Sequence, residues 1–164
     1  MLLTGPGSPE GRCPGCGYVG RVVSDRTVRA ILDPGEANKL LAVERRFCRT
    51  PRCEVLYYGD DGRIVPKSAS RVRVGLKETR DQVPLCYCLG LERADVSREI
   101  AQAGHSAIAA RVIGAVRSGR AACEVLNPSG ACCLGEVKRT VREIANAPRV
   151  ARAGRKRSFW RRRG

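Results

Sequence analysis

Short hydrophobic segments in the middle of the chain have the pattern of β-strands. Residues 54–58 and 63–65 are rich in β-branched and aromatic side chains, and they flank residues 59–62, whose Asp-Gly step favours a tight turn. This pattern predicts a β-hairpin. Residues 71–77 alternate with a period of two, with three apolar side chains between mostly charged neighbours, and they predict a half-buried strand.

From residue 84 onward, the apolar positions follow the period of helices. Residues 93–103 predict a first short helix, because Val96 and Ile100 lie four positions apart and Gly104 supplies a C-terminal stop. Two further helices follow. Their expected apolar faces are Ile108, Val112 and Val116, after a cap at Ser106, and Val137, Val141 and Ile144, ending before Pro148.

Nine cysteines among 164 residues add the first chemical information. The N-terminus lacks the basic segment, apolar stretch and cleavage site of a secretion signal, and no run is long enough to span a bilayer. We therefore expect a cytoplasmic protein that is not transmembrane. In a reducing compartment, clustered cysteines bind metal more often than they form disulfides.

The first four cysteines have the spacing of a structural metal site. Cys13 and Cys16 enclose a Pro-Gly turn, which brings both thiolates to the same side, and Cys48 and Cys53 supply a second pair separated by four residues. Such a set holds one tetrahedral ion, most often zinc, although spacing alone does not distinguish zinc from iron. We expect a zinc-ribbon-like site that contributes folding energy and leaves no open position for catalysis.

The other five cysteines predict a second site in the helical half. Cys86 and Cys88 precede the first predicted helix, Cys123 follows the second, and Cys132 and Cys133 precede the third. Backbone N–H groups at helix starts stabilise anionic thiolates and sulfide, which suits a 2Fe-2S cluster. The spacing by itself also permits a second zinc ion or unligated thiols.

These patterns predict an α+β protein in four parts. Residues 1–11 are an N-terminal extension, residues 12–80 a small zinc-ribbon-like β domain, residues 81–147 a small helical domain with the second cysteine site, and residues 148–164 a disordered basic tail. No internal repeat is present, and the predicted helices are too short for a coiled coil.

The tail carries much of the formal net charge of +15. The last sixteen residues hold eight of the 31 lysines and arginines and no acid. Such an end either contacts a polyanion, such as nucleic acid or an acidic membrane surface, by releasing counterions, or it is a solvated tail. The candidate contact residues are Arg155, Lys156, Arg157, Trp160, Arg161, Arg162 and Arg163.

The cysteine motifs resemble those of a known family. They are residues 13–17 (Cys-Pro-Gly-Cys-Gly), 47–58, 86–90 (Cys-Tyr-Cys-Leu-Gly), Cys123 and 127–137. The motifs of the second half look like the bacterioferritin-associated ferredoxin-like (BFD-like) 2Fe-2S domain. All of them together resemble the N-terminal domain of the CopZ-type copper chaperones, which combines a mononuclear zinc site with a 2Fe-2S cluster, over about residues 12–146.

The resemblance also implies which cysteines act as ligands. It assigns zinc to Cys13, Cys16, Cys48 and Cys53, and the cluster to Cys86, Cys88, Cys123 and Cys133, with Cys132 as the alternative fourth ligand. Eight or nine residues separate the last two cluster ligands, whereas two do so in the simple ferredoxin-like domains. The only methionine is Met1, so this sequence lacks the Met-x-Cys-x-x-Cys copper motif of full CopZ-type chaperones.

We therefore expect a non-enzymatic redox protein that binds zinc and a 2Fe-2S cluster and transfers one electron at a time in copper handling. It would reduce Cu(II) to Cu(I) or assist delivery, together with a copper-binding chaperone or transporter, or another redox partner. An exposed cysteine could also bind Cu(I) directly. The same residues are compatible with a nucleic-acid-binding zinc-ribbon module that uses its Arg-rich tail, and with an iron or redox sensor.

Overall fold

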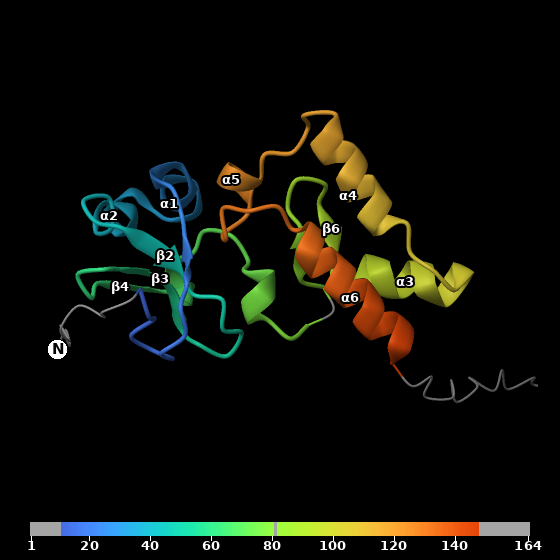
Figure 1. The fold of residues 1–164 in the computed structure, drawn as a ribbon, viewed down its shortest axis with the longest axis horizontal. Coiled ribbons are helices and arrows are strands. Elements are labelled where there is room, and N and C mark those ends of the chain that lie inside the picture. The colour runs from blue at the N-terminus through green and yellow to red at the C-terminus, as the bar shows by residue number, and fades with distance from the viewer. Residues whose placement is uncertain (1–10, 81, 148–164) are drawn as a thin grey trace, which may run out of the picture.

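A computed structural model describes residues 11–80 and 82–147 of the chain. Two parts lie side by side, a small antiparallel sheet with two short helices and a group of longer helices (Figure 1). The α+β prediction is confirmed at the level of a mixed fold with a small antiparallel sheet. Nearly all of the predicted N-terminal extension and the whole basic tail, with its candidate polyanion contacts, lie outside the described residues.

The first part is built on a four-stranded antiparallel sheet in the order β1-β2-β3-β4. Its elements are β1 (Arg21–Val22), β2 (Arg45–Phe47), β3 (Val55–Gly59) and β4 (Ile64–Pro66), followed by the 3₁₀ turn η1 (Lys67–Ala69). The predicted hairpin is confirmed, since β3 and β4 pair with Tyr57 opposite Val65. Gly62 has a φ of 85°, which explains the glycine in the Asp-Gly step of the turn.

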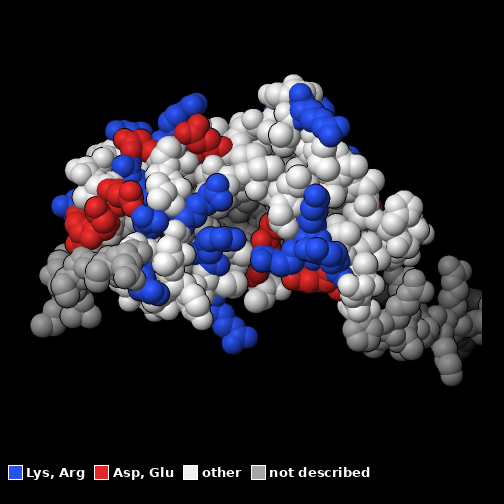
Figure 2. All heavy atoms as spheres, in the orientation of Figure 1, with Lys and Arg blue, Asp and Glu red and all other residues white. Residues whose placement is uncertain are grey.

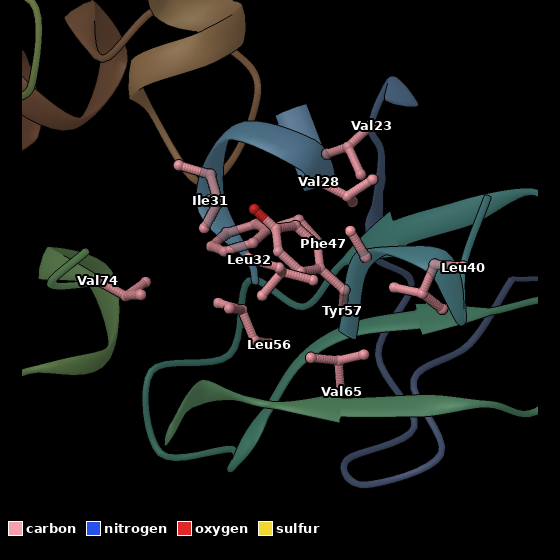
Figure 3. Packing of buried hydrophobic residues seen from close by; sticks show 11 residues of the cluster. Val23, Val28, Ile31, Leu32, Leu40, Phe47, Leu56, Tyr57, Val65 and Val74 are labelled. Atoms are coloured by element: carbon pink, nitrogen blue, oxygen red, sulfur yellow. The ribbon is translucent and has the colours of Figure 1, made fainter. Parts of the chain in front are cut away.

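Two short helices between β1 and β2 complete the core of the sheet. The hydroxyl of Ser24 caps α1 (Asp25–Ile31), and α2 (Pro34–Asn38) has proline at its start. Figure 3 shows Phe47 and Tyr57 at the centre of this core, with ring centroids 5.8 Å apart. The other buried members of the cluster are Val23, Val28, Ile31, Leu32, Ala37, Leu40, Leu56, Val65 and Val74.

The strand predicted for residues 71–77 is wrong. The 3₁₀ turn η2 (Gly75–Lys77) occupies its second half. A Cβ at Gly75 would lie 1.9 Å from the carbonyl oxygen of Pro84, so the chain packs there against backbone instead of pairing as a strand. Lys77, which the alternation assigns to solvent, is buried, with 6% of its surface exposed.

The second part pairs two short strands with helices that share one core. Its elements are β5 (Pro84–Cys86), β6 (Leu91–Glu92), α3 (Arg93–Ala103), α4 (Ile108–Arg117), α5 (Cys123–Leu126) and α6 (Leu134–Asn146). α6 packs on α3 and α4. The fully buried side chains of this core include Val96, Ile108, Val112 and Val137.

The helices predicted around residues 93–103, after Ser106 and before Pro148 are confirmed as α3, α4 and α6. One expected core position is wrong, because Val116 is 44% exposed and Ala115 is buried in its place. The buried face of this short helix follows the i, i+4, i+7 spacing from Ile108, and Val116 falls one position beyond it.

Glu99 organises the junction between α3 and α4. Its carboxylate accepts hydrogen bonds from Ser106 Oγ and Ala107 N, both at 2.8 Å, and pairs with Arg111. Ala107 and not Ser106 occupies the N-cap position of α4, but Ser106 Oγ accepts a hydrogen bond from the first helical N–H, Ile108 N, at 3.2 Å. Burial raises the pKa of Glu99, but the hydrogen bonds and the Arg111 charge outweigh it, so the pKa is lowered overall.

The lowered pKa of Glu99 predicts a pH-dependent contribution to stability. This contribution is present above the unfolded pKa of about 4.3 and is lost as the pH falls through the folded pKa. We expect Glu99→Gln to lower the melting temperature near neutral pH, and the difference from wild type to shrink toward about pH 3. Thermal unfolding followed by circular dichroism measures this. Glu54→Gln, at a side chain that is 74% exposed, is the control, and a pH-independent difference for Glu99→Gln would contradict the assignment.

The two parts of the fold meet through α5 and the loop that follows it. α5 packs on α1, where Thr27 Oγ1 donates to the carbonyl oxygen of Glu124 at 2.7 Å. Tyr57 Oη donates to the carbonyl oxygen of Pro128 at 2.6 Å, and Figure 3 shows this hydroxyl at the edge of the core. The sheet part therefore holds the segment that carries Cys123.

Tyr57→Phe tests the hydrogen bond between the two parts. Because the carbonyl of Pro128 would lose a buried donor, we expect the free energy of unfolding to fall by about 1–3 kcal/mol. Denaturant titration measures the change. Tyr18→Phe, at a tyrosine that is 70% exposed, should change stability little, and equal effects of the two substitutions would argue against the contact.

Charged side chains of both signs are mixed on one face of the molecule. On the face drawn in Figure 2, Lys and Arg side chains are spread over both parts, with Asp and Glu side chains among them. No helix within residues 11–80 and 82–147 is long and apolar enough to cross a bilayer.

Candidate metal centres

The first four cysteines converge on one point. The Sγ atoms of Cys13, Cys16, Cys48 and Cys53 all lie within 4.8 Å of one another. Cys13 and Cys53 are 3.9 Å apart, and Cys16 and Cys48 are 3.7 Å apart. A tetrahedral ion with Zn–S bonds of about 2.3 Å places its sulfur atoms about 3.8 Å from one another. The donor set and its spacing therefore fit a zinc ion.

Two tight turns place these thiols. In the first turn, Gly17 N donates to the carbonyl of Cys13 at 2.8 Å, and Gly17 has a φ of 75° that favours glycine. In the second, Cys53 N donates to the carbonyl of Thr50 at 3.2 Å. Cys48 directly follows β2, and its N–H donates to the carbonyl of Leu56 in β3 at 2.9 Å. The sheet thus fixes one pair of thiols against the other.

Hydrogen bonds support the negative charge that a metal requires on these sulfurs. Burial raises the pKa of Cys13, and the N–H groups of Gly15 and Cys16 partly offset it. Burial also raises the pKa of Cys16, but Thr50 Oγ1 at 3.1 Å, a backbone hydrogen bond and the neighbouring thiols outweigh it and lower the pKa to about 7. Crowded thiols do not all ionise together without a cation, so this geometry favours metal binding.

The second group of cysteines forms pairs. Cys88 Sγ and Cys123 Sγ are 3.5 Å apart, and the buried thiols of Cys86 and Cys133 also interact. Cys132 is exposed and lies beside Cys123. Burial, followed by the neighbouring thiols, raises the pKa of Cys123 to about 12. Four thiols are the number of protein ligands that a 2Fe-2S cluster takes.

Helix starts converge on this second group, as the sequence predicts. Cys123 begins α5 and Cys133 immediately precedes α6. Ala122 N donates to Cys88 Sγ at 3.3 Å. Backbone N–H groups in such positions stabilise thiolate and sulfide charge, so the surroundings as well as the donor set fit an iron-sulfur cluster.

Comparison with known proteins identifies the first site. Residues 10–71 match the model of the CopZ family described as a zinc binding domain. These residues form a CopZ-type zinc binding domain. All four clustered cysteines of the first site lie within it, so the zinc prediction for this part of the chain and the CopZ-like resemblance are confirmed at the level of the domain.

Two further comparisons extend beyond the CopZ-type domain. The copper chaperone CopZ of Archaeoglobus fulgidus is 32% identical over 128 residues, which cover 78% of this chain and 60% of the relative. The X-ray structure of the N-terminal domain of that protein superimposes with a TM-score of 0.66 at 31% identity, over 78% of this chain and 95% of the solved one. The likeness therefore reaches into the half that carries the second cysteine group. The chain spans about 60% of the length of the curated relative.

Two side chains other than the four thiols make contacts around the first metal site. Thr50 contacts the Cys16 thiol, and Tyr58 Oη accepts a hydrogen bond from Gly20 N and donates to Gly11 O, both at 2.7 Å. The Phe47–Tyr58 segment gives no signal of these contacts, because they join positions far apart in the chain. The burial of Lys77 is also not predictable from the sequence, because the alternation of residues 71–77 assigns this position to solvent.

Proposed function

We propose that this chain is a non-enzymatic cytoplasmic protein that binds zinc and a 2Fe-2S cluster and transfers single electrons in copper handling. The observation that carries the proposal is the second set of paired thiols beside a CopZ-type zinc binding domain. The copper assignment is supported by the similarity to the copper chaperone CopZ. Enzymatic turnover is not part of the proposal, because the zinc site has all four positions filled by thiols.

The zinc site has a structural role in this proposal. Cys13, Cys48 and Cys53 are buried, and all four ligands come from turns attached to the sheet. A tetrahedral ion with four thiolates has no position left for a substrate. The binding energy of the ion instead stabilises the fold.

The cluster ligands in this proposal are Cys86, Cys88, Cys123 and Cys133. Cys86 and Cys133 are buried, with exposures of 2% and 4%, so they would bind the cluster on the side that faces the protein interior. Cys133 is favoured over Cys132 because it is buried and interacts with Cys86, whereas Cys132 is exposed. When bound, a 2Fe-2S cluster accepts or releases one electron, which is the change that separates Cu(II) from Cu(I).

A partner would reach this site from the side of Cys88 and Cys123, which are only partly buried. A surface hollow of about 360 Å³ lies next to Cys88, because Leu89, the following residue, forms part of its wall. Its lining residues are Leu89, Leu91, Arg111, Gly114 and Arg120. The exposed Cys132, beside Cys123, is available as a ligand for Cu(I), a soft cation. The partner in this proposal is a copper-binding chaperone or transporter, or another redox protein.

Anaerobic mixing with copper tests the proposal. Protein reconstituted with iron and sulfide and then reduced is mixed with Cu(II) in the presence of a chromophoric Cu(I) chelator. We expect about one Cu(I) per chain above the amount formed by Cys86→Ser, which retains the other thiols. Equal amounts of Cu(I) from both proteins would assign the reduction to free thiols and contradict the proposal. Cys132→Ser keeps the four proposed cluster ligands, and it should form as much Cu(I) as wild type because the added chelator takes up the product.

A further inference from the structure

A buried lysine lies against the zinc-binding turn. Lys77, the last residue of η2, is 6% exposed. Its Nζ donates to the carbonyl oxygens of Thr50 and Cys53, both at 3.0 Å, and lies 6.0 Å from the centroid of the Phe47 ring. Both carbonyls belong to the turn that carries two of the zinc ligands, so the ammonium group is bound to the backbone of that turn.

Among the described residues, no carboxylate pairs with this ammonium group. The adjacent Glu78 pairs with Arg73 instead. A buried charge without a counter-charge is costly, and two carbonyl oxygens and an aromatic ring at this distance offset only part of the cost. A divalent ion held by four thiolates keeps two uncompensated negative charges, which is the counter-charge that the lysine lacks.

The same turn contacts the loop of the second cysteine group. Gly75 N, at the start of η2, donates to Tyr87 Oη at 3.0 Å, and Tyr87 Oη donates to the carbonyl of Arg73 at 2.8 Å. Tyr87 lies between Cys86 and Cys88 in the sequence. η2 also packs against β5, where a Cβ on Gly75 would meet the carbonyl oxygen of Pro84.

We propose that Lys77 is the electrostatic counter-charge of the zinc thiolate site, and that η2, held between Lys77 and Tyr87, ties that site to the Cys86–Cys88 loop. Lys77 is a positioning residue, because it acts through the Thr50 and Cys53 carbonyls and not as a ligand. The inference depends on the zinc site alone and not on the nature of the metal in the second group.

Zinc affinity tests the first half of the inference. Lys77→Met keeps the length of the side chain and removes its charge. Competition with a chromophoric chelator should show about 10–100-fold weaker zinc binding, the range found for outer-shell partners of metal ligands. Lys138→Met, which removes the same charge from an exposed position on α6, is the control and should bind zinc as wild type does. Unchanged affinity in Lys77→Met would overturn the inference.

A second readout separates charge from packing. Iron substituted into the first site cycles between a ferric form with one uncompensated negative charge and a ferrous form with two. Lys77 should stabilise the ferrous form, so Lys77→Met should lower the reduction potential of the iron-substituted site, while Lys138→Met leaves it unchanged. A lysine with only a packing role would leave the potential where it is, and that result would overturn the electrostatic assignment even if zinc affinity falls.

Hydrogen exchange tests the connection to the second group. At saturating zinc, Lys77→Met and Tyr87→Phe should both speed amide exchange in residues 83–91, because each removes one end of the contact through η2. Tyr18→Phe and Lys138→Met are the controls. Exchange in residues 83–91 that stays at the wild-type rate in both test variants would show that η2 does not tie the two sites together. Neither outcome depends on whether iron binds to the second group.

Discussion

Cys48→Ser should abolish zinc binding and unfold the sheet part of the protein. Cys48 is 1% exposed, and its N–H and its thiol join β2, β3 and the metal site. A structural zinc ion contributes about 10–16 kcal/mol of apparent binding energy in zinc-finger peptides, and whole domains are stable by only about 5–15 kcal/mol. The core around Phe47 and Tyr57 is too small to replace that contribution. Elemental analysis and circular dichroism measure zinc per chain and the folded content.

The matched control for this prediction is Cys132→Ser. Cys132 is exposed and lies in the other part of the protein, so its substitution should leave zinc content and melting temperature unchanged. A Cys48→Ser variant that keeps one zinc per chain, or that loses zinc and melts at the wild-type temperature, would contradict a structural role for the site. Removal of zinc from the wild type with a strong chelator should reproduce the effect of Cys48→Ser.

Cys86→Ser should remove iron and sulfide from the reconstituted protein while zinc stays bound. Cys86 is 2% exposed and interacts with Cys133 on the inner side of the second group. A serine oxygen is a poor substitute for a thiolate as a ligand of an iron-sulfur cluster. The two sites lie in different parts of the fold, so zinc per chain should remain at the wild-type value. Iron, sulfide and zinc analysis of the two proteins measures the effect.

Paired substitutions at the last two cysteines identify the fourth ligand. Cys133→Ser should behave like Cys86→Ser, and Cys132→Ser should keep iron and sulfide at the wild-type level. The opposite result would assign the fourth position to Cys132. Equal loss of zinc and iron in Cys86→Ser would argue against two separate sites.

Local patterns predict those parts of the fold that depend on local interactions. The hairpin at β3 and β4 follows from two runs rich in β-branched and aromatic residues around an Asp-Gly turn. α3 follows from apolar spacing and the Gly104 stop, whose φ of 78° confirms the left-handed cap. The four cysteines of the zinc site are also predictable, because the two pairs have spacings that fit a single ion.

Some features depend instead on contacts between distant residues. The sequence analysis predicts neither α1 nor α2, and each is so short that tertiary packing decides its existence. The strand predicted for residues 71–77 is wrong because Gly75 packs against the Pro84 backbone and Lys77 turns inward to the zinc-binding turn. The alternation of the sequence shows only which side chains are polar. It therefore predicts an exposed position even for a polar side chain, such as Lys77, that is buried with hydrogen-bond partners.

The contact between the two parts also cannot be predicted from the sequence, because it joins residues that are far apart in the chain. Thr27 and Glu124 are about 100 positions apart in the sequence, and their hydrogen bond forms only in the folded chain. The predicted division near residue 80 follows the change in hydrophobic period, which reports secondary structure and says nothing of where α5 docks. The docking of α5 on α1 brings the second cysteine group close to the CopZ-type domain.

Metal analysis of protein purified without oxygen tests the central claim most directly. Iron, sulfide, zinc and copper are measured per chain, and electron paramagnetic resonance spectra are recorded before and after reduction. We expect about two irons, two sulfides and one zinc per chain, with a one-electron 2Fe-2S signal that appears on reduction. Zinc alone, with no iron or sulfide retained after anaerobic reconstitution, would contradict the claim.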